Sequence, residues 1–274
     1  PATITGLVAE SPDPGPHRIS MVIENRIGVV EFRNLSLRTG GGAGLPPGQT
    51  LETGVDIPSD SAMAAAMTDY YAFLIDTEMA TTKQIRHHLR DTLGCRMPII
   101  DTQVSYGGAG GILREGVLSD YIDIHGYWNH PHLISDKKSP ISFTIRNTSE
   151  VTDPCGGRLA NLARYRVAGL PFSVSEYNIS YPSDYIAETF PLPALFAGLQ
   201  DWDALYQYSY RSFTQDYVPR VIWQAQQIVG RSATLVHAPA AALLFRQGTV
   251  GPWPTVFTIA LPKTSVPALT AGPR

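Results

Sequence analysis

The chain has 274 residues, of which 16% are charged, and a formal net charge of -3 at pH 7. This balance, without a basic cluster, argues against a nucleic-acid-binding surface and a polybasic membrane patch. No apolar run approaches the roughly 18 residues that a transmembrane helix needs, so we expect no membrane span. The 24 glycines and 22 prolines indicate that much of the chain forms shaped loops.

The first 58 residues alternate apolar and polar side chains with a period of two, as in ITGLVAE, HRISMVIE and IGVVEFRNLSLRT. This period predicts β-strands. The Gly- and Pro-rich stretch GGGAGLPPGQTLETG near the end of this region predicts a linker or a domain exit. We therefore predict a short β-sandwich-like segment over residues 1–58.

Beyond residue 60 the pattern changes to helices alternating with strands. Apolar residues at helical spacing predict a helix over residues 61–94, with Gly94 as its C-terminal cap. Later helices are predicted over residues 156–169, 183–200 and 238–248, and strands near 98–104, 121–127, 171–177 and 203–209. Such alternation predicts a parallel sheet covered by helices. Because a (β/α)8 barrel needs eight strands, we predict that residues 59–274 form about four βα units, half of such a barrel.

Polar and aromatic side chains gather where the predicted strands end, which is the edge where parallel α/β folds build their sites. Aromatic rings stack on the C–H face of a sugar, and amide and carboxyl groups bind its hydroxyls. The pattern therefore predicts a carbohydrate site. Its candidate substrate-binding residues are Gln103, His125, Tyr127, Trp128, His130, Tyr177, Asn178, Trp202 and Tyr206.

Glu176, at the end of the third predicted strand, is the candidate catalytic residue. A carboxylate there can attack the anomeric carbon of a sugar, while a second carboxyl group protonates the leaving oxygen. A hydrogen bond from Tyr127 or Tyr177 would keep Glu176 ionised. The structural alternative is an ordinary solvated loop acid, or a cap for the helix that begins near Ser183.

Other chemistries have weaker support. His125, His130 and His132 lie close together in the sequence, but their spacing of five and two does not match a helical zinc motif, and we predict no metal ligand. The chain has no G-x-S-x-G motif around a serine nucleophile. The glycine runs at 40–42 and 107–111 lack the pattern of a phosphate-binding loop. Cys95 and Cys155 are too few for a disulfide framework, and one bridge and two free thiols both stay open.

Three segments, SDYIDIHGYWNHP, PFSVSEYN and QDWDALYQYSY, resemble the second half of clan A glycoside hydrolases, which are retaining (β/α)8 enzymes with two catalytic glutamates. His125 and Tyr127 match the His-x-Tyr pattern at the end of the sixth barrel strand. Glu176 matches the nucleophile at the end of the seventh, and Trp202 or Tyr206 matches the aromatic residue of the eighth. The N-terminal VVEFRNLSLRTGG looks like the last strands of a carbohydrate-binding module.

The resemblance implies a retaining β-glycosidase that acts on a polysaccharide or oligosaccharide and needs no cofactor. A polysaccharide substrate implies secretion or a periplasmic location, although the first residues do not resemble a signal peptide. The chain departs from the family in one respect. The acid/base glutamate of the family follows an asparagine, and no such Asn-Glu pair precedes the His-x-Tyr segment; Glu24 and Glu78 are poor substitutes.

We therefore expect the acid/base residue to lie upstream of Pro1, in a larger enzyme of which this chain is a part. Half a barrel exposes unpaired strand edges, so the expected partners are the missing half-barrel or a second copy of the chain. The alternative function is a carbohydrate-binding protein with a degenerate barrel and no catalysis.

Overall fold

The computed structural model describes residues 64–134, 143–211 and 224–272, so the predicted β-sandwich-like segment, residues 1–58, lies outside the described residues. The chain divides into two units. The smaller comprises Pro1–Leu74 and Pro267–Arg274, and its described parts belong to α1 (Ala64–His87) and α7 (Val266–Ala271). The larger, Ile75–Val266, holds all the predicted site residues.

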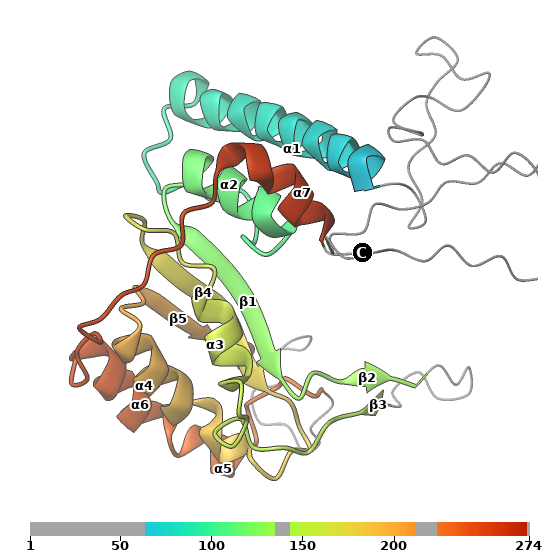
Figure 1. Ribbon diagram of the computed structural model, residues 1–274. Coiled ribbons are helices and arrows are strands. Elements are labelled where there is room, and N and C mark those ends of the chain that lie inside the picture. The colour runs from blue at the N-terminus through green and yellow to red at the C-terminus, as the bar shows by residue number, and fades with distance from the viewer. Residues whose placement is uncertain (1–63, 135–142, 212–223, 273–274) are drawn as a thin grey trace, which may run out of the picture. The chain divides into compact units, whose positions relative to one another are not determined.

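The larger unit is mixed α/β (Figure 1). After α1 and a π-helical turn at His88–Thr92, its elements are α2 (Gly108–Leu118), β1 (Ile122–Trp128), β2 (His132–Leu133), β3 (Phe143–Thr144), α3 (Gly157–Ala163), β4 (Phe172–Ile179), a 3-10 turn (Ile186–Thr189), α4 (Pro191–Leu199), β5 (Ala204–Gln207), α5 (Ser232–Leu235), α6 (Ala238–Arg246) and a 3-10 turn (Lys263–Ser265).

The main sheet has the strand order β1-β4-β5, and both of its strand pairs are parallel. Helix α3 connects β1 to β4, and α4 connects β4 to β5, so each strand lies beside the next one that follows a helix. This confirms three of the four predicted strands and the parallel α/β pattern. The antiparallel pair of β2 and β3, which the sequence did not predict, is a separate two-stranded sheet.

The remaining predicted strand, near 98–104, is not formed as a strand. Its backbone nevertheless runs beside β1, because the amide of Val104 donates to the carbonyl of Asp123 at 3.0 Å and the amide of Asp120 donates to that of Ile99 at 2.9 Å. The Asp120 carboxylate also accepts a hydrogen bond from the Ile99 amide, at 2.7 Å, and pairs with Arg86 and Arg90. The segment is thus held in place.

Helix α2 was missed because its start is rich in glycine. Gly107 and Gly108 have positive φ values of 84° and 56°, which glycine adopts without steric cost. A Cβ on Gly111 would lie 2.2 Å from the carbonyl oxygen of Tyr106 and 2.4 Å from that of Val104. The backbone and its close contacts therefore require glycines at the start of α2. Because glycines lower helix propensity, the sequence of this segment does not show the pattern of a helix.

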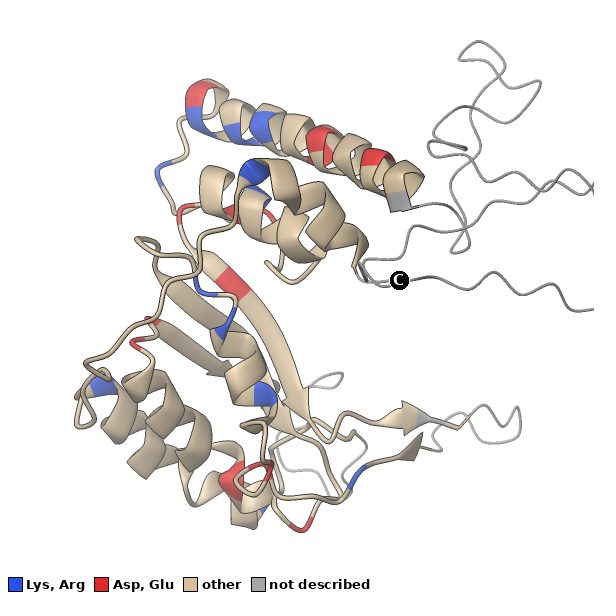
Figure 2. Ribbon diagram, viewed as in Figure 1, with Lys and Arg blue, Asp and Glu red and all other residues tan. Residues whose placement is uncertain are grey.

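Four other helices confirm the sequence prediction, whereas α5 and α7 were not predicted. The first predicted helix includes α1 and its π-helical turn, and it ends at Gly94, whose φ of 66° reverses the chain. Helices α3, α4 and α6 fall inside the three later predicted ranges. Helices α4 and α6 pack on each other and carry almost no charge, as their nearly uncoloured ribbons in Figure 2 show.

One face of the sheet forms the hydrophobic core. The core contains Ile122 and Ile124 of β1 and Phe172 and Val174 of β4. These side chains form one buried cluster with Leu159 and Leu162 of α3, Ala197 of α4, and Trp202, which precedes β5. Full burial of each large aliphatic or aromatic side chain contributes about 1.5–3 kcal/mol. Within the described part of the chain, no helix combines the length and apolarity needed to cross a membrane.

Candidate functional site

The candidate site lies on the other, polar face of the sheet. Successive side chains of a strand point to opposite faces. Because Ile122 and Ile124 face the core, the residues between and after them, Asp123, His125 and Tyr127, share the opposite face. This face is continued by the polar residues of β4.

A β-bulge in β4 decides which of its residues join this face. Ile124 pairs with Val174 but His125 pairs with Glu176, so Ser175 is an extra residue. An extra residue reverses the alternation of side chains beyond it. Val174 and Tyr177, three positions apart, therefore both face the core, and Glu176 lies beside His125 on the polar face.

Glu176 is contacted by two side chains of β1. The hydroxyl of Tyr127 donates a hydrogen bond to Oε2 of Glu176, and Nδ1 of His125 lies 3.4 Å from the same oxygen. The Glu176 side chain is 27% exposed, so it is open to a ligand. Burial, and then the hydrogen bond to Glu176, raise the pKa of Tyr127 well above its usual range. Tyr127 therefore remains a phenol and a hydrogen-bond donor.

Asp123 contacts three neighbouring side chains of β1 and β4. The hydroxyls of Ser173 and Ser175 donate to its two carboxylate oxygens, and Nε2 of His125 lies 3.6 Å from Oδ2. The sequence analysis did not select Asp123. The period-two rule could have found it, since it precedes His125 by two positions on the same strand face.

Gln103 reaches the site from the segment beside β1. Its Oε1 accepts a hydrogen bond from the backbone amide of His125 at 2.9 Å, and its Nε2 lies 2.8 Å from Nδ1 of the same residue. Nε2 also donates to the hydroxyl of Tyr106 at 3.0 Å. Its amide group is thus engaged with protein partners, whereas we had expected it to bind the sugar directly.

Two aromatic rings contact that of Tyr127. The rings of His130 and Tyr208 each meet it edge-on, with centroid distances of 5.5 and 6.0 Å. Tyr206 on β5 is 59% exposed. Trp128, a predicted sugar contact, instead packs against the core, and its ring nitrogen donates to the carbonyl of Thr148 at 2.8 Å. Of these residues, Tyr208 was not among the predicted substrate contacts.

Three predicted sugar contacts lie in the interior instead. Tyr177 is 0% exposed, because the bulge turns it to the core, where its hydroxyl donates to Glu150. Asn178 is 1% exposed and its amide donates to the carbonyl of Tyr208. Trp202, 5% exposed, precedes β5 and packs against Phe172. These three side chains are therefore part of the interior and do not line the candidate site.

The described residues contain no group of three or more His, Cys, Asp or Glu side chains that could hold a metal ion. His125 faces Asp123 and Glu176, while Nδ1 of His130 contacts the carbonyl of Pro131 at 3.0 Å. Cys95 and Cys155 are both free thiols, which settles the question that the sequence left open.

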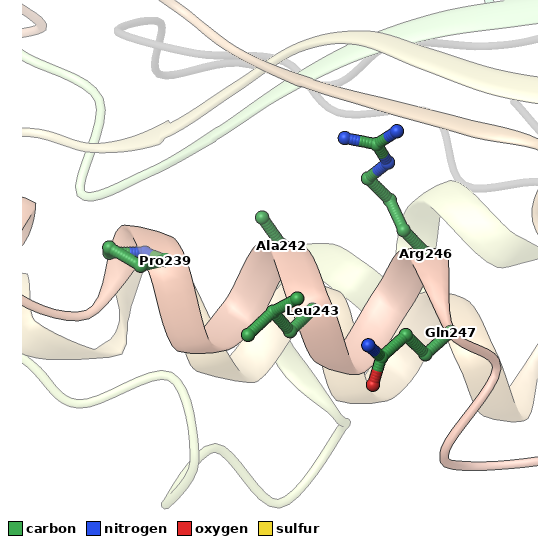
Figure 3. Close-up of a pocket in the computed structure, with 5 residues that line it drawn as sticks. All are labelled: Pro239, Ala242, Leu243, Arg246 and Gln247. Atoms are coloured by element: carbon green, nitrogen blue, oxygen red, sulfur yellow. The ribbon is translucent and has the colours of Figure 1, made fainter.

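A hollow of about 600 Å³ lies elsewhere, on α6. Pro239, Ala242, Leu243, Arg246 and Gln247 line it, and Figure 3 shows that all of them come from one helix and its C-terminal end. A ligand site normally joins polar groups that converge from several elements. The polar face of the sheet meets this condition and the hollow does not, so we place the candidate site at Glu176.

Comparisons with known proteins add no relative. No protein-family model matches the chain, and neither a curated protein nor a solved structure matches it.

Proposed function

We propose that this chain carries the nucleophile half of a retaining β-glycosidase that acts on β-linked polysaccharides or oligosaccharides. The observation that carries the proposal is the hydrogen bond from Tyr127, one residue before the end of β1, to Glu176, three residues before the end of β4. Parallel α/β folds build their sites toward the carboxyl ends of the strands. The half-exposed rings of this face provide stacking surfaces for a sugar.

The chemistry follows from the state of the two groups. The carboxylate of Glu176 attacks the anomeric carbon, the new carboxylate–carbon bond forms as the glycosidic C–O bond breaks, and water later releases the sugar. Tyr127 positions the attacking carboxylate by one hydrogen bond. Tyr127 keeps its own hydroxyl proton and does not transfer it to Glu176, because the pKa of Tyr127 lies well above the usual range.

The order β1-β4-β5 supports a partial (β/α)8 barrel as the larger architecture. In such a barrel each strand is parallel to the next one along the chain and lies beside it, as in this sheet. The polar face would then be the interior of the barrel. Another strand of the barrel would bring the acid/base carboxyl, about 5–5.5 Å from that of Glu176 in a retaining enzyme. A polysaccharide substrate would place the protein in the periplasm or outside the cell.

One observation favours a second function, carbohydrate binding without catalysis. Asp123 is the other acidic residue of β1 and β4, and the hydroxyls of Ser173 and Ser175 already engage both of its oxygens. It is therefore a poor general acid. If no acid is supplied by another part of the protein, the same face would bind a saccharide without cleaving its natural linkages.

The two functions are separated by hydrolysis of a panel of aryl β-glycosides. Aryl leaving groups need little protonation, so the nucleophile alone should release a burst of phenol. The proposal predicts release by the full chain and none by Glu176→Gln, whereas the exposed Asp76→Asn control releases as much as the unchanged chain. Saccharide binding without release from any of the three proteins would support the binding function.

A further inference from the structure

The orientation of the Gln103 amide is fixed by a backbone group. The amide nitrogen of His125 is a hydrogen-bond donor only, so the Gln103 atom 2.9 Å from it must be the oxygen, Oε1. The NH₂ group of Gln103 then faces Nδ1 of His125 at 2.8 Å. An NH₂ group can only donate, and Nδ1 of His125 must therefore accept, with no proton of its own.

We propose that Gln103 is a positioning residue that holds His125 as the neutral imidazole with its proton on Nε2. The Nε2 proton then faces the carboxylate of Asp123, whose Oδ2 lies 3.6 Å away. Protonation of Nδ1 as well would place two donors against each other at 2.8 Å. Gln103 thus opposes the formation of an imidazolium at the site.

This effect of Gln103 matters because the two carboxylates near His125 favour its imidazolium form. His125 faces two carboxylates, Asp123 at 3.6 Å and Glu176 at 3.4 Å, and nearby negative charge normally stabilises an imidazolium. Tyr127, two residues along the same face, remains a phenol, and Arg158 of α3 contacts the backbone carbonyl of His125, at 3.1 Å, from the other side of the sheet. The amide of Gln103 is the neutral group that acts against the two carboxylates.

The consequence concerns Glu176, and this step rests on the proposed function. With Nδ1 unprotonated, His125 cannot donate to Oε2 of Glu176, and Tyr127 is the side chain that does. A second, cationic donor would stabilise the free carboxylate further and so weaken it as a nucleophile. Gln103 therefore tunes the reactivity of Glu176 through His125 without touching the substrate.

The first test measures the proton positions directly. Long-range ¹H–¹⁵N NMR of the full chain with ¹⁵N-labelled histidine separates the two neutral tautomers and the imidazolium. The His125 signals are identified by their loss in His125→Asn. We expect a pyridine-type Nδ1 and a pyrrole-type Nε2 at pH 7. An imidazolium, or a proton on Nδ1, at that pH overturns the proposal, whether or not the protein cleaves any sugar.

The second test changes the amide. Gln103→Glu replaces the donor at Nδ1 by a carboxylate, so His125 should become an imidazolium at pH 7 and aryl glycoside turnover (kcat) should fall about tenfold, with little change in KM. The exposed Gln247→Glu adds the same charge immediately after α6 and should change neither. A pyridine-type Nδ1 that survives in Gln103→Glu would contradict the role of Gln103. The predicted tautomer in a chain without hydrolysis would instead count against the glycosidase function alone.

Discussion

Tyr127 and Glu176 are joined diagonally across two parallel strands. In the strand register Tyr127 is opposite Asn178 and Glu176 is opposite His125, yet the hydroxyl of Tyr127 reaches Oε2 of Glu176. Diagonal neighbours lie within reach of a long aromatic side chain. The contact exists because the bulge at Ser175 brings Glu176 to the face of Tyr127.

Tyr127→Phe tests the contribution of this bond to the reaction. The bond fixes the position of the attacking oxygen, and a misplaced reacting group can lose about 100-fold in rate, so kcat for aryl glycosides should fall roughly 100-fold. The melting temperature should change little, because Glu176 is partly exposed and water can replace the phenol. Tyr165→Phe, which removes an exposed hydroxyl bound to Arg164, is the matched control. An unchanged kcat in Tyr127→Phe would show that the bond has no part in the reaction.

Replacement of Glu176 by Ala should reduce turnover on the order of 10⁴-fold or more, as loss of a catalytic nucleophile does. A small anion such as azide can enter the space and attack the anomeric carbon in its place. The account therefore predicts that azide restores phenol release in Glu176→Ala and yields a glycosyl azide of inverted configuration. Azide should not accelerate the unchanged chain or the exposed Asp76→Asn control. Failure of azide to act on a folded Glu176→Ala would argue against a nucleophilic role.

Tyr177→Phe should lower stability rather than substrate binding. The hydroxyl of Tyr177 donates to Glu150, and both residues are buried. Loss of a partner from a buried carboxyl group costs about 1–3 kcal/mol or more, which urea unfolding measures. KM for aryl glycosides should stay within error of the unchanged chain. A raised KM with unchanged stability would restore Tyr177 to the list of sugar contacts.

Glu150 should make stability depend on pH. Burial raises the pKa of Glu150, although hydrogen bonds from Tyr177 and from the Leu159 amide act in the opposite direction. A raised carboxyl pKa means that the folded state binds more protons than the unfolded state above the ordinary value of about 4.3. The free energy of unfolding should therefore fall as pH rises from about 4 through the raised pKa. Glu150→Gln should remove this part of the slope; an equal slope in both proteins would contradict it.

Gly126 should be intolerant of a side chain. A Cβ there would lie 2.7 Å from Nε of Arg158 and 2.9 Å from the methyl carbons of Leu162. Such overpacking costs about 1–3 kcal/mol, and it would displace the neighbouring His125 and Tyr127. Gly251→Ala is the control, because nothing lies within 4 Å of its Cβ position. Equal thermal melts for both variants would show that β1 and α3 are less closely packed than described.

The sequence predicted those features that depend on local pattern. Gly94 ends its helix because a left-handed residue is needed there, and β1 and β4 form where apolar residues cluster. The sequence grouped Glu176, His125 and Tyr127 by the rule that parallel strands end at one edge, although β1 and β4 continue beyond His125 and Glu176 to Trp128 and Ile179. These three side chains do meet.

The features that the sequence did not predict depend on tertiary packing. The bulge at Ser175 has no sequence signal in SVSEYN, and it turns Tyr177 into the core. Helix α2 begins with glycines because close contacts leave Gly111 no room for a Cβ. Trp202 was assigned to the site by its residue type, but it fills the core beside Phe172. The barrel, the β-sandwich-like segment and the glycosidase activity remain predictions.

The most direct test of the central claim is covalent capture of Glu176. A 2-deoxy-2-fluoro-β-glycoside with a dinitrophenyl leaving group needs no acid catalyst, and its fluorine slows release of the glycosyl-enzyme. The account predicts that the intact mass of the chain rises by one fluoroglycosyl unit and that peptide mapping places it on Glu176, with no adduct in Glu176→Gln. An adduct on another residue, or none with any sugar of a panel to which the folded chain binds, would contradict the claim that Glu176 is a nucleophile.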